Sequence, residues 1–120
     1  MSMEKLILEV NELVDKEYGR AGARFGLVNH SDHESYAILL EELQEAKFEV
    51  DSVDRCLEEF WYYVKSNSTA SFKIESCQRL HRRALLCACE MIQVAAMAKK
   101  ASATLFSAGH ETILGKEKEQ

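Results

Sequence analysis

Apolar residues recur at helical spacing in the first part of the chain. From Met3 to about Tyr18 they repeat every three to four residues, with charged residues between them. The stripe consists of Leu6, Val10, Leu13, Val14 and Tyr18. This pattern predicts a first amphipathic helix. Gly19 and Gly22 then interrupt it, so we expect a frayed helix end and a short loop over residues 19–29.

A second helix is predicted to begin at a capping box. Ser31 stands three residues before Glu34, so the Ser31 hydroxyl can accept from the Glu34 amide while the Glu34 carboxylate accepts from the Ser31 amide. Neither Gly nor Pro follows until the polar cluster at residues 66–71. We therefore expect one long helix over residues 34–65 and a turn after it.

The third predicted helix runs to about Ser107, with Gly109 as its C-cap. Small apolar residues lie around its whole circumference, as expected of a helix that is surrounded by neighbours. Three helices can hardly enclose it, so we expect self-association as a dimer or tetramer. We predict one all-α domain over residues 1–109, an antiparallel helical bundle with two long central helices, and a flexible polar tail over residues 110–120.

Three carboxylates interrupt the buried stripe of the second helix. Glu42, Glu45 and Glu49 fall within roughly 60° of one another on a helical wheel. Apolar residues continue the same stripe on both sides, namely Ile38, Val53, Cys56 and Phe60. Burial of unpaired carboxylates is costly unless they are protonated or a cation neutralises them. The pattern therefore predicts a cation at this stripe.

The third helix offers a matching pair. In an antiparallel hairpin, facing residues have a constant sum of residue numbers, which a turn centred near Ser68 sets near 137. Both Glu45 with Glu90 and Glu42 with Gln93 give 135. Both pairs are thus expected to face each other across the hairpin.

Carboxylates without histidine favour a hard cation, Mg²⁺ or alternatively Mn²⁺, over zinc. Di-iron bundles need a Glu-x-x-His repeat, which the chain lacks. Because Mg²⁺ commonly acts together with substrate phosphates, phosphate chemistry is the natural hypothesis.

Composition narrows the class of protein further. The chain has no Pro and five Gly among 120 residues, which favours helices. A net charge of −5 argues against a nucleic-acid partner, and the absence of a long apolar run argues against a membrane span. Four cysteines without a C-x-x-C pair are expected to be reduced thiols in a helical core. We expect a soluble, cytoplasmic protein.

Other interpretations stay open at this stage. Glu-Glu-x-x-Glu also arises on solvated faces of acidic helices, and Arg79 and Arg83 can pair with such carboxylates. Arg83 is equally a candidate for binding phosphate, and His33 is a candidate for substrate binding or for packing in its helical turn. A non-catalytic oligomeric helical protein, such as a phage-encoded interaction module, is therefore the alternative to an enzyme.

Four segments in order resemble one family. They are Arg24-Phe25-Gly26, His33-Glu34-Ser35-Tyr36-Ala37, Leu40-Glu41-Glu42-x-x-Glu45 and Ile92-Gln93-Val94-Ala95-Ala96-Met97-Ala98. The chain from about Arg24 to Ala101 resembles the MazG-like, all-α nucleoside triphosphate pyrophosphohydrolases, especially their small phage and prophage branch. Two features depart from the wider family, since Gln93 stands where that family has Asp and residues 55–78 form an extra stretch.

The resemblance implies cleavage between the α and β phosphates of a nucleoside triphosphate, which gives the monophosphate and pyrophosphate. It implies Mg²⁺ ligands at Glu42, Glu45, Glu90 and Gln93. Glu41 or Glu49 is then expected to position or deprotonate the attacking water. A protein that binds the nucleotide without hydrolysing it is a further possibility, because Gln93 removes one negative charge from the ligand set.

Overall fold

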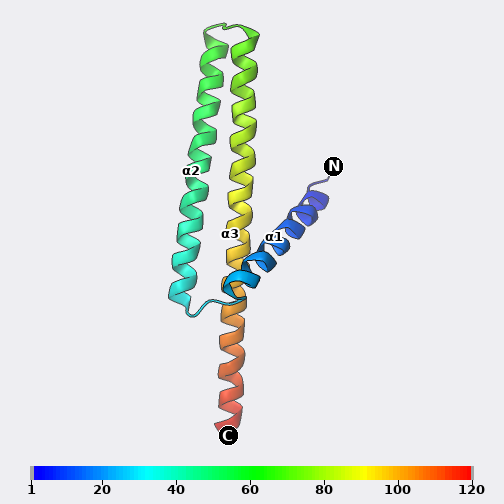
Figure 1. Ribbon diagram of the computed structural model, residues 1–120, viewed down its shortest axis with the longest axis vertical. Helices are drawn as coiled ribbons and strands as arrows, with labels where there is room; N and C mark the ends of the chain where they lie inside the picture. The colour runs from blue at the N-terminus through cyan, green and yellow to red at the C-terminus, as the bar shows by residue number, and fades with distance from the viewer. Residues whose placement is uncertain (1, 120) are drawn as a thin grey trace. The chain divides into compact units, whose positions relative to one another are not determined.

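The computed structural model describes residues 2–119, and the side chains of residues 2–108. The described chain is all-α and has three helices, α1 (Met3–Phe25), α2 (Asp32–Lys65) and α3 (Ala70–Glu119). Figure 1 shows α2 and α3 joined by a tight turn and running in opposite directions. The chain divides into two compact units, residues 1–42 with 92–120 and residues 43–91.

Helix α1 is longer than the sequence predicts, because Gly19 and Gly22 lie within it. A Cβ atom at Gly22 would lie 2.2 Å from a terminal methyl carbon of Leu27, so the missing side chain makes room for the returning loop. Gly26 ends the helix with φ 91°, a conformation that glycine adopts without steric cost. Each glycine inside a helix destabilises it by about 1 kcal/mol relative to alanine. At Gly22 this cost is offset by the close packing of the loop against the helix.

The first unit has a small core where α1, the start of α2 and the second half of α3 meet. Its buried members are Val14, Ala21, Ala96 and Met97, and Tyr18, Ile38, Leu39 and Ile92 pack against them. The α1 stripe that the sequence predicts is therefore buried from Val14 onward. Its first residues, by contrast, are exposed, as Met3 and Ile7 show with exposed fractions of 69% and 58%.

A buried hydrogen bond ties the α1–α2 loop to α3. The Asn29 amide donates to Thr104 Oγ1 at 2.7 Å, and this hydroxyl donates to the Lys100 carbonyl at 2.8 Å. Lys100 itself is 6% exposed. A helical sequence pattern alone does not show how closely the loop covers α3 at this position.

Thr104→Val should leave the buried Asn29 amide without an acceptor. We expect a loss of about 1–3 kcal/mol in the free energy of unfolding, measured by urea denaturation. Ser102→Ala, at an exposed position of the same helix, should change it by no more than about 0.5 kcal/mol. Equal effects of the two substitutions would contradict a structural role for this hydrogen bond.

Helix α2 begins as the sequence predicts, but its cap differs in one bond. The Glu34 amide donates to Ser31 Oγ at 3.1 Å, which is the expected half of the capping box. The returning Glu34 carboxylate accepts from the amide of His30, at 3.4 Å, in place of Ser31. The carboxylate thus caps one residue further out.

The second unit is an antiparallel hairpin of α2 and α3, closed by the predicted polar turn. Asn67 takes a positive φ of 52°, and the Ser66 hydroxyl donates to the Tyr62 carbonyl at 2.8 Å. Tyr63 and Phe72 stack across the turn with ring centroids 5.4 Å apart. Arg79 forms an ion pair with Glu59. These cross-helix contacts place the two helices side by side.

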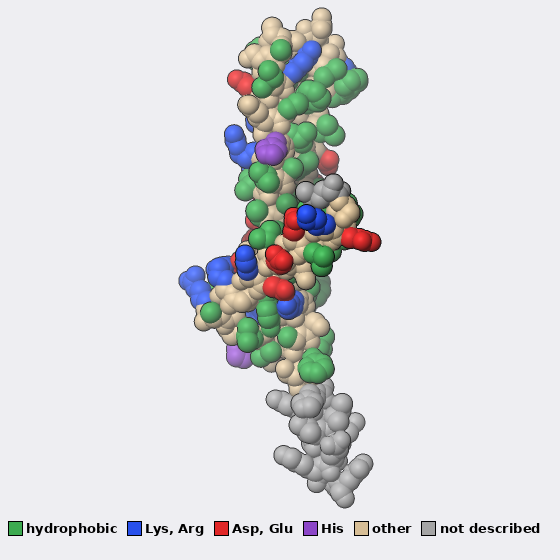
Figure 2. Space-filling model, turned by 90° about the vertical axis from the view of Figure 1, so that its right-hand side faces the viewer, with side chains coloured by type: hydrophobic (Ala, Val, Ile, Leu, Met, Phe, Trp, Pro, Cys, Tyr) green, Lys and Arg blue, Asp and Glu red, His purple; other side chains and the backbone are tan. Residues whose placement is uncertain are grey.

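The hairpin interface is built from small side chains. Ala46, Ser52, Cys56 and Ser76 are the buried residues of this unit, and Ala46 and Ser76 are 1% and 0% exposed. Large apolar residues such as Trp61, Ile74 and Leu85 are more than half exposed. Figure 2 shows hydrophobic side chains across the surface of the hairpin. Only one of the four free cysteines, Cys56, is buried, so the prediction that all four fill the core is wrong.

Two sequence predictions concern the end of α3. Gly109 does not end this helix, which continues to Glu119, because a glycine without a following Pro is tolerated within a helix. The side chains of residues 109–120 lie outside the described part, and the predicted flexible tail over 110–120 stays a prediction. No helix in the described part of the chain combines the length and the apolar character needed to cross a membrane.

Candidate metal site

Two carboxylates face each other across the hairpin at the predicted height. Glu45 on α2 and Glu90 on α3 each offer an oxygen within 4.8 Å of the other. Glu42 lies one turn before Glu45 on the same helix and offers an oxygen within the same distance of the Glu45 carboxylate. Glu45 is exposed, and Glu42 and Glu90 are half-buried. Solvent and ligands can therefore reach these oxygens.

Glu49 extends this cluster along α2. Its carboxylate lies near enough to Glu90 to raise the pKa of Glu90 by like-charge repulsion. Its Oε2 atom is buried and has no hydrogen-bond partner, although Arg83 Nη1 lies 4.0 Å away. Arg83 thus faces Glu49, at an i, i+7 distance from Glu90 on α3. The 4.0 Å separation is longer than the roughly 2.7–2.9 Å of a charge-assisted hydrogen bond, so Arg83 does not hydrogen-bond to Glu49 Oε2.

Glu90 carries the clearest electrostatic signature of the site. Partial burial, followed by the charges of Glu45 and Glu49 and a hydrogen bond with Glu45, raises the pKa of the Glu90 carboxyl. A cation between Glu45 and Glu90 would offset this repulsion and lower the pKa of the Glu90 carboxyl.

The raised pKa of Glu90 predicts a pH effect on the metal-free protein. The folded state holds this proton to higher pH than the unfolded state, so the free energy of unfolding falls as pH rises through the window between the two pKa values. Glu90→Gln should remove this fall and increase stability above that window. Urea denaturation in EDTA from about pH 4 to about pH 7 measures both effects.

Glu58→Gln is the matched control for the pH experiment, since Glu58 is an exposed residue of α2. This variant should keep the parental pH dependence. A parental dependence in Glu90→Gln as well would show that folding does not raise the pKa of Glu90.

Gln93 lies in the first unit, one turn after Glu90 along α3. Its side chain makes a hydrogen bond to Glu17 of α1. Hydrogen bonds from Arg20 and Gln93 lower the pKa of Glu17, and the bond from Arg20 has the larger effect. Gln93 therefore links α3 to α1, a contact that sequence reasoning did not include.

Glu17 is the residue that the sequence analysis missed. On the helical wheel of α1 it lies inside the apolar stripe, between Val10 and Leu13, and this position is the signal that could have identified it. The half-buried carboxylate accepts from Arg20 Nε at 2.9 Å. It belongs to the same unit as Glu42 and Gln93.

The other predicted site residues lie apart from this cluster or at its edge. Glu41 is exposed on α2 beside Glu42. His33 is exposed in the first turn of α2, nine residues or about 13 Å of helix before Glu42. Arg79 pairs with Glu59, and Lys99 pairs with Asp15 and lies 5.1 Å from the Tyr18 ring centroid.

The donor set fits a hard divalent cation. Glu42, Glu45 and Glu90 offer only carboxylate oxygens, the ligand type that Mg²⁺ and Mn²⁺ prefer. The unpartnered oxygen of Glu49 and the raised pKa of Glu90 indicate excess negative charge at the same place. No protein family, curated protein sequence or solved structure matches this chain.

Proposed function

We propose that the protein is a Mg²⁺-dependent nucleoside triphosphate pyrophosphohydrolase, which cleaves between the α and β phosphates to give the monophosphate and pyrophosphate. The observation that carries the proposal is the pair of facing carboxylates, Glu45 and Glu90, with an oxygen of each within 4.8 Å of the other. The resemblance of residues 24–101 to the MazG-like family supports the same reaction.

Glu42, Glu45 and Glu90 would hold the metal ion in this proposal, with Gln93 as a fourth ligand. Gln93 would then exchange its hydrogen bond with Glu17 for the metal. When bound, Mg²⁺ supplies positive charge and Lewis-acid stabilisation for the α-phosphate oxygens. Mn²⁺ has the same ligand preference and is the expected substitute.

Glu49 is better placed than Glu41 to act on the attacking water. Its Oε2 is buried in the cluster and free of hydrogen bonds, whereas Glu41 is exposed. Glu49 would accept a proton as the water oxygen attacks the α-phosphorus and the bond to the bridging oxygen breaks, so that pyrophosphate leaves. Arg83, whose side chain is 47% exposed, would turn toward substrate phosphate.

A pyrophosphate-release assay across ribo- and deoxynucleoside triphosphates tests the proposal directly. With Mg²⁺, and separately with Mn²⁺, we expect equal amounts of nucleoside monophosphate and pyrophosphate. Release of orthophosphate together with a nucleoside diphosphate would indicate cleavage between the β and γ phosphates instead. No release above the protein-free background with any nucleotide would defeat the enzyme proposal.

The second candidate is a non-catalytic, self-associating helical protein. The ion pairs Arg79–Glu59 and Arg83–Glu49 favour it, because they show arginines of α3 already engaged by carboxylates of α2. A helical bundle completed by another copy would also cover the exposed apolar residues of the hairpin. This candidate predicts a melting temperature that does not depend on Mg²⁺. A cytoplasmic location and a phage or prophage origin stay predictions under either candidate.

A further inference from the structure

Within the second unit, no element covers the surface of α3 that faces away from α2, and this surface is an apolar stripe. Ser76 is fully buried toward α2, and Arg79 and Arg83 reach carboxylates of α2. About half a helical turn away, Ile74 and Leu85 are 56% and 55% exposed. Such exposure of large apolar residues at one stripe is typical of a protein contact surface.

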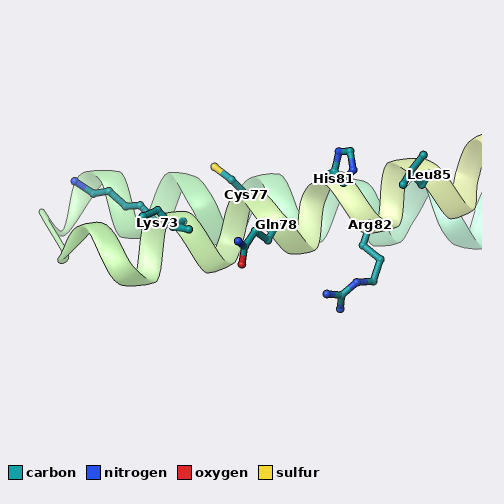
Figure 3. Close-up of a pocket in the computed structure, with 7 residues that line it drawn as sticks. Lys73, Cys77, Gln78, His81, Arg82 and Leu85 are labelled. Carbon is teal, nitrogen blue, oxygen red and sulfur yellow. The ribbon is translucent and has the colours of Figure 1, made fainter.

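We name this surface the α3 outer face, and it consists of Lys73, Ile74, Cys77, His81, Arg82 and Leu85. Together with Gln78, these residues line a shallow groove of about 780 Å³. Figure 3 shows Cys77, His81 and Leu85 projecting from one side of α3 and Arg82 from another. On the helical wheel, Lys73 and Arg82 border the apolar centre on opposite sides. The α3 outer face is therefore an apolar stripe between two cations.

A complementary surface lies at the start of α1. Met3, Leu6, Ile7 and Val10 continue the α1 stripe beyond the core of the first unit, with exposed fractions from 36% to 69%. Glu4 and Glu9 border this stripe on its two sides. We name these six residues the α1 acidic face. It is an apolar stripe between two anions.

We propose that the α1 acidic face of one copy of this chain docks on the α3 outer face of a second copy. The apolar stripes would cover each other, and Glu4 and Glu9 would lie beside Lys73 and Arg82. Two α3 outer faces packed together would instead place cations beside cations. Each copy carries both faces, so one copy can offer its α1 acidic face while a second copy offers its α3 outer face. This goes beyond the self-association that the sequence predicts, because it assigns the two surfaces.

A charge-reversal experiment with two variants of the full chain tests this contact. The first variant is Lys73→Glu with Arg82→Glu, and the second is Glu4→Lys with Glu9→Lys. Each variant alone places like charges at both contacts, and we expect its dissociation constant for self-association to rise about tenfold or more in sedimentation equilibrium. An equal mixture of the two restores opposite charges at both contacts. The mixture should associate about as tightly as the parent chain.

The control is Lys47→Glu, which reverses an exposed lysine of α2 and should leave association unchanged. Circular dichroism checks that each variant keeps the parental helix content. If one variant loses helix content, Lys73→Gln with Arg82→Gln tests the same face by removing the charges instead of reversing them. This variant should also raise the dissociation constant for self-association.

Three results would overturn the proposal. They are a parent chain that is monomeric at every concentration, reversed variants that associate as tightly as the parent, and a mixture that associates no better than either variant alone. Pyrophosphate release by such a monomer would leave the proposed function intact.

Discussion

Replacement of Glu45 by Gln is expected to reduce pyrophosphate release by about 10²–10³-fold. Glu45 lies between Glu42, one turn earlier on α2, and Glu90, across the hairpin. Gln has nearly the same size and keeps one oxygen, but it removes the negative charge that would bind the cation. The measurement is the rate of pyrophosphate formation at saturating Mg²⁺, at the same pH for every variant.

The matched control is Glu58→Gln, which makes the same chemical change at an exposed position of α2. It should leave the rate unchanged. Thermal melting supplies a second measurement, since Mg²⁺ bound only by the folded state raises the melting temperature. We expect this rise in the parent chain and in Glu58→Gln, and a much smaller rise in Glu45→Gln. Equal rates and equal shifts in all three would count against both the metal site and the enzyme.

Ala96→Leu is expected to destabilise the first unit by about 1–3 kcal/mol. Ala96 is fully buried and packs with Val14, Ala21 and Met97. A leucine there must either displace α1 or take a strained rotamer, because close-packed cores have no room for three additional carbons. The melting temperature should fall by about 5–15 °C.

Ala95→Leu provides the comparison at the neighbouring position, because Ala95 is exposed on the same helix. It makes the same chemical change without entering the core, and we expect a shift within about 0.5 kcal/mol. A large loss in Ala95→Leu together with no loss in Ala96→Leu would show that α3 presents a different face to α1. Circular dichroism melting of the two variants separates these outcomes.

The all-α class and the α2 hairpin could be predicted because local signals dominate there. The capping residue Ser31, an uninterrupted helical stretch and the polar cluster after Lys65 define α2 with little help from tertiary contacts. The end of α1 could not be predicted in the same way. Gly22 is tolerated within the helix because Leu27 occupies the space above it, and that contact depends on the path of the loop.

In the candidate site, too, contacts within the hairpin could be predicted from the sequence, whereas a contact between α1 and α3 could not. Periodicity and hairpin symmetry suffice to predict that Glu45 faces Glu90, since both helices rise by the same distance per residue. They do not predict that Gln93 bonds to Glu17, because the α1 register against α3 depends on side-chain packing. The sequence leaves open whether Arg83 pairs with Glu49, and the structure places Arg83 Nη1 4.0 Å from Glu49 Oε2.

In the proposed metal site, the buried methyl group of Ala46 would influence which ion is preferred. Ala46 follows Glu45 on α2 and is 1% exposed, so its size limits how closely α2 approaches α3 beside the carboxylates. Oxygen ligands surround Mg²⁺ at about 2.0–2.1 Å and Ca²⁺ at about 2.3–2.6 Å. If Glu45 and Glu90 share an ion, a larger side chain at position 46 widens the cage and shifts its preference toward the larger ion. A single apolar residue that touches no ligand would thus act as a size filter.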